Sequence, residues 1–413
     1  MIERKSYLDR IQGAFKLTPI VVLIGARQVG KTSIMKSLPV KPGEETLFLN
    51  GQDVEVAARF QLFSTIEQYL KIYLNPEMKG LLMIDEFQFI QGISTMLKLL
   101  TDKYEGLRIL CSGSSSLDIL QQIEESLAGR VRVIEVLSLS FSEYLQFKDE
   151  RLWRLQQTVT DGRDDALVRP LQQALEEYLV YGGLPRVALT SEPEEKIAML
   201  NDIYQTYLLH DVRTYVANEH FVGFNRLLRL LAVQIGNLVN VNELSRESGL
   251  PYGKCEEYIY LLQQMYIIKL IEPHFTNKRK VIGKMNKVYF CDIGLRNMIY
   301  NSFNDINFRT DNGALFENFV LLELWRNKPA SGIIRFYRTQ AGTEVDFVVD
   351  NSGHKIAVEC KFKRLVNPVS IPALSNLADE ENMSGRYIAN INMDETYKET
   401  RLMPGILADR IKV

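Results

Sequence analysis

Residues 25–32 read Gly25-Ala26-Arg27-Gln28-Val29-Gly30-Lys31-Thr32. Their spacing is G-x-x-x-x-G-K-[ST], which is typical of a phosphate-binding loop. The apolar run 19–24 before the octet predicts a buried strand, and residues 33–38 after it can open a helix. The glycines permit a tight turn whose backbone N–H groups point at phosphate oxygens. We therefore expect this loop, with Ser33, to bind ATP, Lys31 to act on the β- and γ-phosphates, and the Thr32 hydroxyl to hold Mg²⁺. A chance glycine-rich turn is the alternative.

A second motif supports a nucleotide site. Residues 81–84 are apolar and run into Asp85 and Glu86, the Walker B pattern of a central parallel strand. The carboxyl ends of parallel strands meet at one edge of a sheet, so these acids are expected beside the phosphate-binding loop. Asp85 would complete the Mg²⁺ shell, and Glu86 would polarise the attacking water as general base. Two acids after a strand also cap helices, so the pair is informative only because it follows the loop.

Three further positions are candidates for contacts with the nucleotide. Strand 107–111 ends in serines, and Ser114 is expected to sense the γ-phosphate, although a serine-rich turn and helix cap fits equally well. Arg130 is a candidate arginine finger or sensor, acting in its own chain or on a neighbouring subunit, with a surface salt bridge as the alternative. Pro185 ends a Gly-Gly-Leu-Pro break between helices and is expected to contact the base of the nucleotide. The alternative is that this sequence is only a C-cap and stop signal for the preceding helix.

The composition of the chain indicates a globular protein and argues against several other classes of protein. The 413 residues are 46% hydrophobic and 24% charged, as in a globular protein of two or three domains. A formal net charge of -2 gives no overall signal for nucleic acid, so such affinity needs a local patch. The 4 cysteines lie far apart without a C-x-x-C pair, which argues against a zinc site or a disulfide framework. No apolar run approaches the roughly 18 residues that cross a bilayer, so we expect no membrane partner and a cytoplasmic location.

The pattern changes to long helical stretches after about residue 140. Residues 146–222 are expected to form a helical lid, and residues 223–300 follow the element order of a winged helix-turn-helix. The cationic residues of the expected wing are Lys278, Arg279, Lys280, Lys284 and Lys287. This patch predicts contacts to the phosphates of DNA. However, Glu256 and Glu257 in the third helix would be repelled by DNA, so a winged helix that only packs against protein is the equal alternative.

A hairpin is expected in the last third of the chain. Residues 343–349 and 354–363 would pair around a turn at residues 351–353. This pairing would bring Asp346 nearly opposite Ala357 and therefore diagonal to Glu359.

The hairpin and an upstream helix carry a second group of chemically active side chains. Alternation along the strand places Glu359 and Lys361 on one face. With Glu317 on the helix, Asp346 and Glu359 would bind Mg²⁺, while Lys361 would activate water and stabilise a pentavalent phosphate as a catalytic residue. A solvated charged face is the alternative, but the apolar neighbours of Glu359 argue against it.

Together these blocks resemble a large prokaryotic family of predicted AAA-type ATPases related to the signal-transducing STAND class. Its members join a P-loop core to a winged helix and a C-terminal domain that is similar to PD-(D/E)xK nucleases. The segments that carry the resemblance are 25–32, 82–88, 111–116, 129–130, 181–185, 287–294, 316–318 and 344–363. The resemblance implies an ATPase site at Lys31, Thr32, Asp85 and Glu86, and a nuclease-like site at Glu317, Asp346, Glu359 and Lys361. One departure is that Val345 stands where the nuclease pattern has proline.

The expected fold is therefore α/β with four parts: a parallel-sheet P-loop NTPase domain (1–145), a helical lid (146–222), a winged helix (223–300) and an α/β restriction-endonuclease-like domain (301–413). Two functions follow. In the first, ATP binding and hydrolysis control DNA binding or cleavage by the C-terminal part. In the second, the chain is a nucleotide-dependent switch or scaffold whose inactive nuclease-like domain binds protein partners. A homo-oligomer is compatible with both, and a small-molecule kinase is a remote third option.

Overall fold

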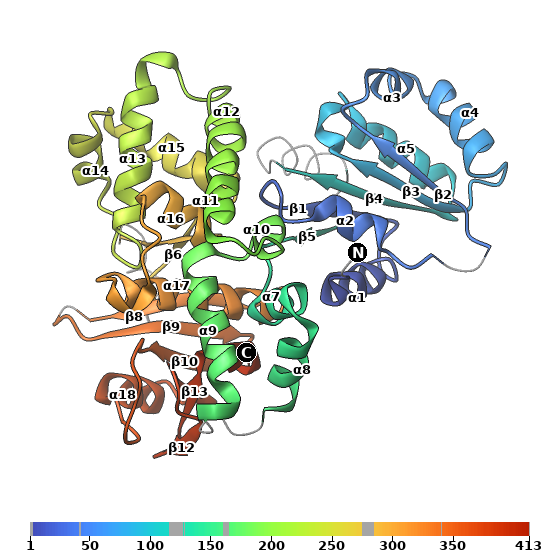
Figure 1. The fold of residues 1–413 in the computed structure, drawn as a ribbon. Helices are drawn as coiled ribbons and strands as arrows, with labels where there is room; N and C mark the ends of the chain where they lie inside the picture. Colours follow the sequence, from blue (N-terminus) through green and yellow to red (C-terminus); the bar gives the residue numbers. More distant parts are fainter. Residues whose placement is uncertain are drawn as a thin grey trace. The chain divides into compact units, whose positions relative to one another are not determined.

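The computed structural model describes residues 3–40, 43–114, 127, 129–159, 165–274, 285–339 and 341–412. The chain divides into two compact units (Figure 1). The first comprises Met1–Leu137 and Gln264–Tyr266, and the second comprises Ser138–Gln263 and Ile267–Val413. The expected lid, winged helix and C-terminal domain thus share one unit, and their finer division stays a prediction. None of the helices in the described ranges has the length and apolar character that a bilayer crossing needs.

The first unit alternates helices and strands. Its main elements are α1 (Lys5–Ala14), β1 (Ile20–Ile24), α2 (Lys31–Lys36), β2 (Thr46–Asn50), α3 (Val54–Arg59), α4 (Phe63–Tyr73), β3 (Gly80–Asp85), α5 (Ile93–Lys103), β4 (Leu107–Gly113) and β5 (Val131–Glu135). The described strands form a parallel sheet in the order β2-β3-β4-β1-β5. Every residue of β1 and β3 is buried, because α3 and α4 lie on one side of the sheet and α1 on the other (Figure 1). The expectation of a parallel α/β sheet is confirmed.

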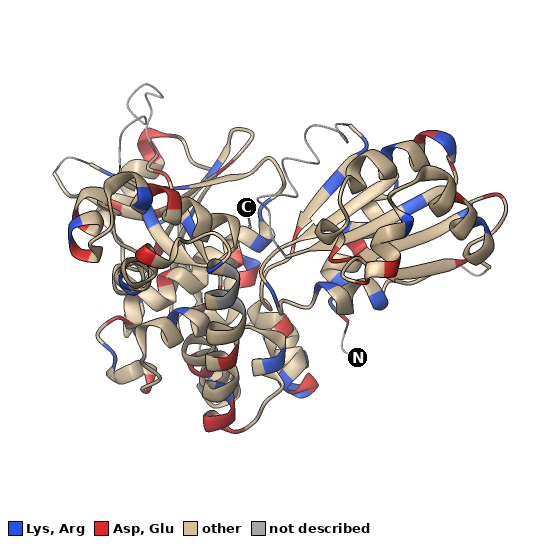
Figure 2. Cartoon of the chain, turned by 90° about the horizontal axis from the view of Figure 1, so that it is seen from above, with Lys and Arg blue, Asp and Glu red and all other residues tan. Residues whose placement is uncertain are grey.

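The second unit begins with helices. These are α7 (Phe141–Lys148), α8 (Glu150–Thr158), α9 (Asp165–Tyr181), α10 (Pro185–Ala188), α11 (Pro193–Asp202) and α12 (Leu209–Val212). Next come α13 (Phe221–Val233), α14 (Val241–Ser248), α15 (Tyr252–Gln264), β6 (Ile268–Ile271), β7 (Lys287–Phe290) and α16 (Ile293–Tyr300). The order from α13 to β7 is the one expected for a winged helix, and its use as a DNA-binding module stays a prediction. Figure 2 shows segments of Lys and Arg (blue) and of Asp and Glu (red) interspersed along the described ribbon.

A mixed sheet ends the second unit. Its elements are α17 (Asn312–Asn327), β8 (Ile333–Arg338), β9 (Glu344–Asn351), β10 (His354–Cys360), α18 (Pro372–Glu380), β11 (Gly385–Asn390), β12 (Glu395–Tyr397) and β13 (Thr400–Pro404). The described strands lie in the order β12-β13-β11-β10-β9-β8. The sheet is joined to the preceding hairpin, since the N–H of Phe336 in β8 donates to Glu272 O at 3.1 Å just after β6. The hairpin β6–β7 is therefore built onto the C-terminal sheet.

The hairpin of β9 and β10 has a different register from the expected one. Asn351 pairs with His354, and the two residues between them, Ser352 and Gly353, both have positive φ, at 53° and 99°. A two-residue turn of this kind matches the twist of the strands. Ala357 consequently pairs with Val348, so the predicted pairing of Asp346 with Ala357 is wrong. Continued by one step, the observed register places Asp346 directly opposite Glu359.

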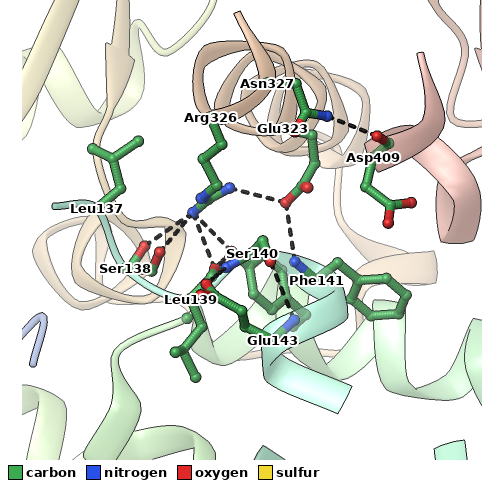
Figure 3. A network of polar contacts seen from close by, with 12 residues as sticks. Leu137, Ser138, Leu139, Ser140, Phe141, Glu143, Glu323, Arg326, Asn327 and Asp409 are labelled. Carbon is green, nitrogen blue, oxygen red and sulfur yellow. Dashed lines mark hydrogen bonds and ion pairs between the residues drawn. The ribbon is translucent and has the colours of Figure 1, made fainter. Parts of the chain in front are cut away.

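The segment that opens the second unit is held by α17 (Figure 3). Arg326 donates to the carbonyl oxygens of Ser138 at 3.1 Å and Leu139 at 3.0 Å. It also pairs with Glu323 at 2.9 Å, and the same Glu323 oxygen accepts from the N–H of Phe141 at 3.0 Å. The start of α7 is thus fixed by side chains from a helix far along the chain.

This anchor predicts a pH-dependent stability. Burial raises the pKa of Glu323 from 4.5 to about 7, helped by Asp409 and opposed by Arg326. Between these values the folded state binds the proton more tightly than the unfolded state, so stability falls as the pH rises through this window. In wild type we expect the free energy of unfolding to fall by about 3 kcal/mol between pH 4.5 and 7 because of this group. In Glu323→Gln this decrease should be absent. Urea unfolding of both proteins at several pH values between 4.5 and 7 measures the free energy of unfolding. The same dependence on pH in wild type and Glu323→Gln would contradict the prediction.

Candidate functional site

The phosphate-binding loop connects β1 to α2 and depends on its glycines. Gly25 has φ 150°, and a Cβ there would lie only 2.2 Å from the carbonyl oxygen of Val136. Gly30 precedes α2 with φ 94°, in the left-handed region that favours glycine. The backbone of the loop therefore adopts a conformation and a close approach that larger residues would not permit. The strand, loop and helix occur where the sequence predicted them.

Lys31 is buried beneath this loop. Its Nζ donates to the carbonyl oxygens of Gly25 at 2.9 Å and Ala26 at 2.8 Å. Burial lowers the pKa of Lys31 to about 8, although Glu86 and Asp85 act in the opposite direction. The ammonium is therefore in a poorly solvated position close to two carboxylates, where a phosphate oxygen would be a stronger partner than a neutral carbonyl.

The two expected Mg²⁺ ligands are in direct contact. Thr32 Oγ1 donates to Asp85 Oδ2 at 2.8 Å, and Ser112 Oγ on β4 donates to the other Asp85 oxygen. Because β4 lies between β1 and β3, its serine fills the space between the two motifs. A hydroxyl and a carboxylate oxygen are the ligands that Mg²⁺ prefers. These donors fit the ion that the sequence motifs imply.

Glu86 is held in place by two polar side chains. It has φ 51° and ψ 45°, which turns the chain directly after β3. Gln88 Nε2 donates to Glu86 Oε2 at 2.6 Å, and Ser114 Oγ donates to the same oxygen at 3.0 Å. Ser114 thus lies at the site but contacts the expected base, and its role as a γ-phosphate sensor stays a prediction. Sequence reasoning assigned no role to Gln88, although its position two residues after Glu86 in a short turn was a usable signal.

The remaining nucleotide candidates lie elsewhere. Arg130 directly precedes β5, and β5 pairs in parallel with β1, so Arg130 lies at the amino edge of the sheet, opposite the phosphate-binding loop. It forms a partly exposed ion pair with Asp102 at 2.8 Å. Arg130 therefore does not lie at the phosphate site of its own chain, so the prediction that it acts there is wrong. A role on a neighbouring subunit stays a prediction. Pro185 is the first residue of α10 in the second unit, and its contact with a base also stays a prediction.

The second group of acids gathers around β9 and β10. Asp346 Oδ2 accepts a hydrogen bond from the N–H of Cys360 at 2.7 Å. Burial and the nearby charges of Glu317 and Glu359 raise the pKa of Asp346 well above its usual value. Lys361 Nζ pairs with Glu359 Oε1 at 2.7 Å. The expected acids and the lysine of the nuclease-like pattern are thus neighbours, with Glu317 contributed by α17.

Lys287 corrects one sequence prediction. It was expected on an exposed wing, but it is 2% exposed and lies among the acids. Its Nζ is 3.1 Å from Glu317 Oε1 and forms a second ion pair with Glu344. A lysine engaged in this way is not available to the phosphates of DNA. The other wing cations, Lys278, Arg279, Lys280 and Lys284, lie outside the described residues.

Tyr289 is a site residue that sequence reasoning missed. Its buried hydroxyl donates to Glu317 Oε1 at 2.5 Å, the same oxygen that Lys287 contacts. Lys287 and Tyr289 are two residues apart on β7, so both side chains leave the same face of the strand. That alternation was visible in the sequence, but the partner of this face was not.

The expected metal ligands fit a cation only in part. Within the described ranges, no group of three or more His, Cys, Asp and Glu side chains is placed to hold a metal ion, so a cation here would depend on two carboxylates. Glu317 is already engaged by Lys287 and Tyr289. Glu359, in contrast, is buried, and its Oε2 has no hydrogen-bond partner among the described residues. A cation beside this oxygen would satisfy a buried charge, so Glu359 and Asp346 fit a metal ion, whereas Lys287 and Tyr289 already occupy the Oε1 of Glu317.

The chain is similar to known proteins along most of its length. Residues 17–145 match the model of an AAA domain, and residues 172–305 and 312–404 match two domains of unknown function (DUF8612 and DUF4143). An uncharacterized protein of Mycobacterium tuberculosis is 26% identical over 364 residues, covering 87% of this chain and 74% of that protein. An uncharacterized protein of Methanocaldococcus jannaschii is 27% identical over 357 residues, covering 84% and 76%.

A solved structure agrees with the fold. The Walker-type ATPase of Pyrococcus abyssi has a TM-score of 0.51 at 14% identity, covering 72% of this chain and 96% of that chain. At this identity the likeness concerns the fold alone. Together with the AAA-domain match and the geometry of Lys31, Thr32 and Asp85, it identifies residues 17–145 as an AAA-type P-loop ATPase domain.

Proposed function

We propose that this protein binds ATP with Mg²⁺ and hydrolyses it, and that its nucleotide state controls the acidic site of the C-terminal sheet. The observation that supports hydrolysis is the direct contact of Thr32 with Asp85, with Glu86 next in the chain. A P-loop alone binds phosphate, but an oriented carboxylate beside the expected Mg²⁺ ligands can also accept a proton from water.

Each residue of the first site has a distinct task in this proposal. Lys31 exchanges its two carbonyl partners for phosphate oxygens and neutralises their charge. Thr32 and Asp85 would hold Mg²⁺, which would supply neutralising charge to the phosphates. Glu86 orients the attacking water and accepts its proton, while Gln88 and Ser114 keep the carboxylate in position.

Removing the Lys31 ammonium tests this assignment. We expect Lys31→Ala to weaken ATP binding at least about 10-fold, because a charge-assisted hydrogen bond contributes about 1.5 to 3 kcal/mol. Titration with a fluorescent ATP analogue measures the dissociation constant, and phosphate release measures turnover. Lys36→Ala, which removes another lysine of α2, is the matched control. Equal affinity and turnover of Lys31→Ala and wild type would exclude the proposed ATP site.

The C-terminal site is proposed to bind a divalent cation and, through it, the phosphodiester backbone of DNA. Asp346 and Glu359 would hold the cation, and Lys361 would stabilise charge on the phosphate. Plasmid cleavage with Mg²⁺ or Mn²⁺, with and without ATP, distinguishes this function from the second candidate. Cleavage that Asp346→Ala and Glu359→Ala both abolish would establish an ATP-controlled nuclease.

A nucleotide-dependent switch is the second candidate. The ion pair of Lys287 with Glu317 favours it, because this pair removes one of the expected ligands from the nuclease-like site. In this case the C-terminal sheet binds protein partners, and neither DNA nor RNA is cleaved although ATP is hydrolysed. Arg130 of a neighbouring subunit would complete the ATP site of a homo-oligomer in either function.

A further inference from the structure

The carboxylate site includes a residue pair from outside the C-terminal sheet. Lys287 and Tyr289 lie on β7, in the hairpin that follows the three helices α13 to α15, and both contact one oxygen of Glu317. This oxygen is therefore bonded to an ammonium and a phenol hydroxyl, at 3.1 and 2.5 Å. Lys287 also pairs with Glu344 at the start of β9, so its charge is shared by two acids.

If all are counted as ionised, the acids around Lys287 outnumber their cationic partners by one. The acids are Glu317, Glu344, Asp346 and Glu359, and the cations that pair with them are Lys287, Arg338 and Lys361. The two sides of this group differ. Glu317 and Glu344 share Lys287, whereas Glu359 pairs with Lys361 through Oε1 only, and its buried Oε2 has no partner among the described residues. An added cation would therefore find free carboxylate oxygen at Glu359, beside Asp346.

We infer that Lys287 and Tyr289 are positioning residues that hold Glu317 away from metal coordination, so that the site accepts a single divalent cation at Asp346 and Glu359. This inference rests on the cation site of the proposed function. The Lys287 ammonium neutralises the Glu317 carboxylate, as a second metal ion would. It also occupies the oxygen through which Glu317 could coordinate that ion. The hairpin of the three-helix group is thereby part of the carboxylate site.

The burial of Lys287 supports this role. The side chain is 3% exposed, and the attraction of Glu317, Asp346 and Glu344 more than offsets burial, so the pKa of Lys287 lies above its usual value. The ammonium is therefore charged at neutral pH. Removing the buried lysine of such a pair leaves the charge of the partly buried Glu317 uncompensated. A divalent cation would then be the natural replacement partner of Glu317.

Mn²⁺ binding to the full-length chain without nucleotide tests the inference. Free Mn²⁺ is followed by electron paramagnetic resonance in wild type, Glu359→Gln, Glu317→Gln, Lys287→Met and the double variant Lys287→Met/Glu317→Gln. Any Mn²⁺ held at the ATP site is common to all five proteins and cancels in the comparison. We expect wild type and Glu317→Gln to bind one more Mn²⁺ than Glu359→Gln. We expect Lys287→Met to gain one further Mn²⁺, which the double variant lacks.

Two results would overturn the inference. The first is that Glu317→Gln loses Mn²⁺ as Glu359→Gln does, since Glu317 would then be a ligand. The second is that Lys287→Met gains no Mn²⁺ that depends on Glu317. Equal binding by wild type and Glu359→Gln would instead refute the cation site of the proposed function, while a Glu317-dependent gain in Lys287→Met would still support the role of Lys287.

Folding of the variants provides a readout that needs no metal. Both tryptophans, Trp153 and Trp325, belong to the second unit, so their fluorescence follows its unfolding in urea. Lys287→Met should lower the urea midpoint because it leaves the partly buried Glu317 carboxylate without a counter-ion, and the double variant should recover part of the loss. Independent, additive effects of the two substitutions would contradict the pairing.

Discussion

Glu86→Gln is expected to reduce ATP turnover at least about 100-fold while ATP binding stays intact, because positioned general bases contribute about 10²- to 10⁴-fold to rate. The amide has nearly the shape of the carboxylate and can still interact with Gln88 and Ser114, but it cannot accept a proton from water. Lys31, Thr32 and Asp85 are unchanged, so the phosphates and Mg²⁺ keep their partners. Phosphate release gives the rate, and titration with a fluorescent ATP analogue gives the dissociation constant.

An exposed acid of the same unit provides the control for Glu86→Gln. Glu105→Gln removes one negative charge on the surface just before β4 and should leave both rate and affinity unchanged. If Glu86→Gln turned over ATP as fast as this control, another group would have to activate the water. Weaker ATP binding with a proportionate loss of rate would instead show that Glu86 acts in nucleotide binding.

The first unit could be predicted closely from the sequence because its signals are local. Continuous apolar runs such as residues 20–24 read as buried parallel strands, and the spacing of Gly25, Gly30 and Lys31 is set by phosphate geometry. Asp85 and Glu86 follow a strand, so the topology of a parallel sheet was enough to place them beside the loop. Gln88 was missed because its role depends on where a short turn directs one side chain.

The second unit shows what local patterns leave open. The sequence contains the alternation of Lys287 and Tyr289, but only the packing of β7 against α17 and β9 reveals that this face meets Glu317 and Glu344. The cationic stretch 278–287 predicts a DNA-binding wing, but charge in a sequence does not show that one of its members, Lys287, is buried. The register of the β9–β10 hairpin likewise depends on turn length, which the run Asn-Ser-Gly does not determine.

The segment that opens the second unit is anchored by buried side chains of α17. Arg326 of α17 donates to the carbonyl oxygens of Ser138 and Leu139, and Glu323 accepts from the N–H of Phe141 (Figure 3). Arg326 and Glu323 are almost fully buried, with side-chain exposures of 8% and 1%. The same helix carries Glu317 two turns earlier, so the start of α7 and the carboxylate site share one rigid element.

Above about pH 7, where the Glu323 carboxyl is ionised, Arg326→Ala is therefore expected to destabilise the second unit by about 3 to 5 kcal/mol, because it leaves this carboxylate buried without its partner. Urea unfolding followed by the fluorescence of Trp153 and Trp325 measures this unit, and ATP-analogue binding reports separately on the first. Arg151→Ala is the control, since the exposed pair of Arg151 with Asp149 should contribute at most about 1 kcal/mol. The double variant Arg326→Ala/Glu323→Gln should recover part of the loss by removing the unpaired charge. Equal destabilisation by Arg326→Ala and Arg151→Ala would show that the buried pair does not anchor the segment.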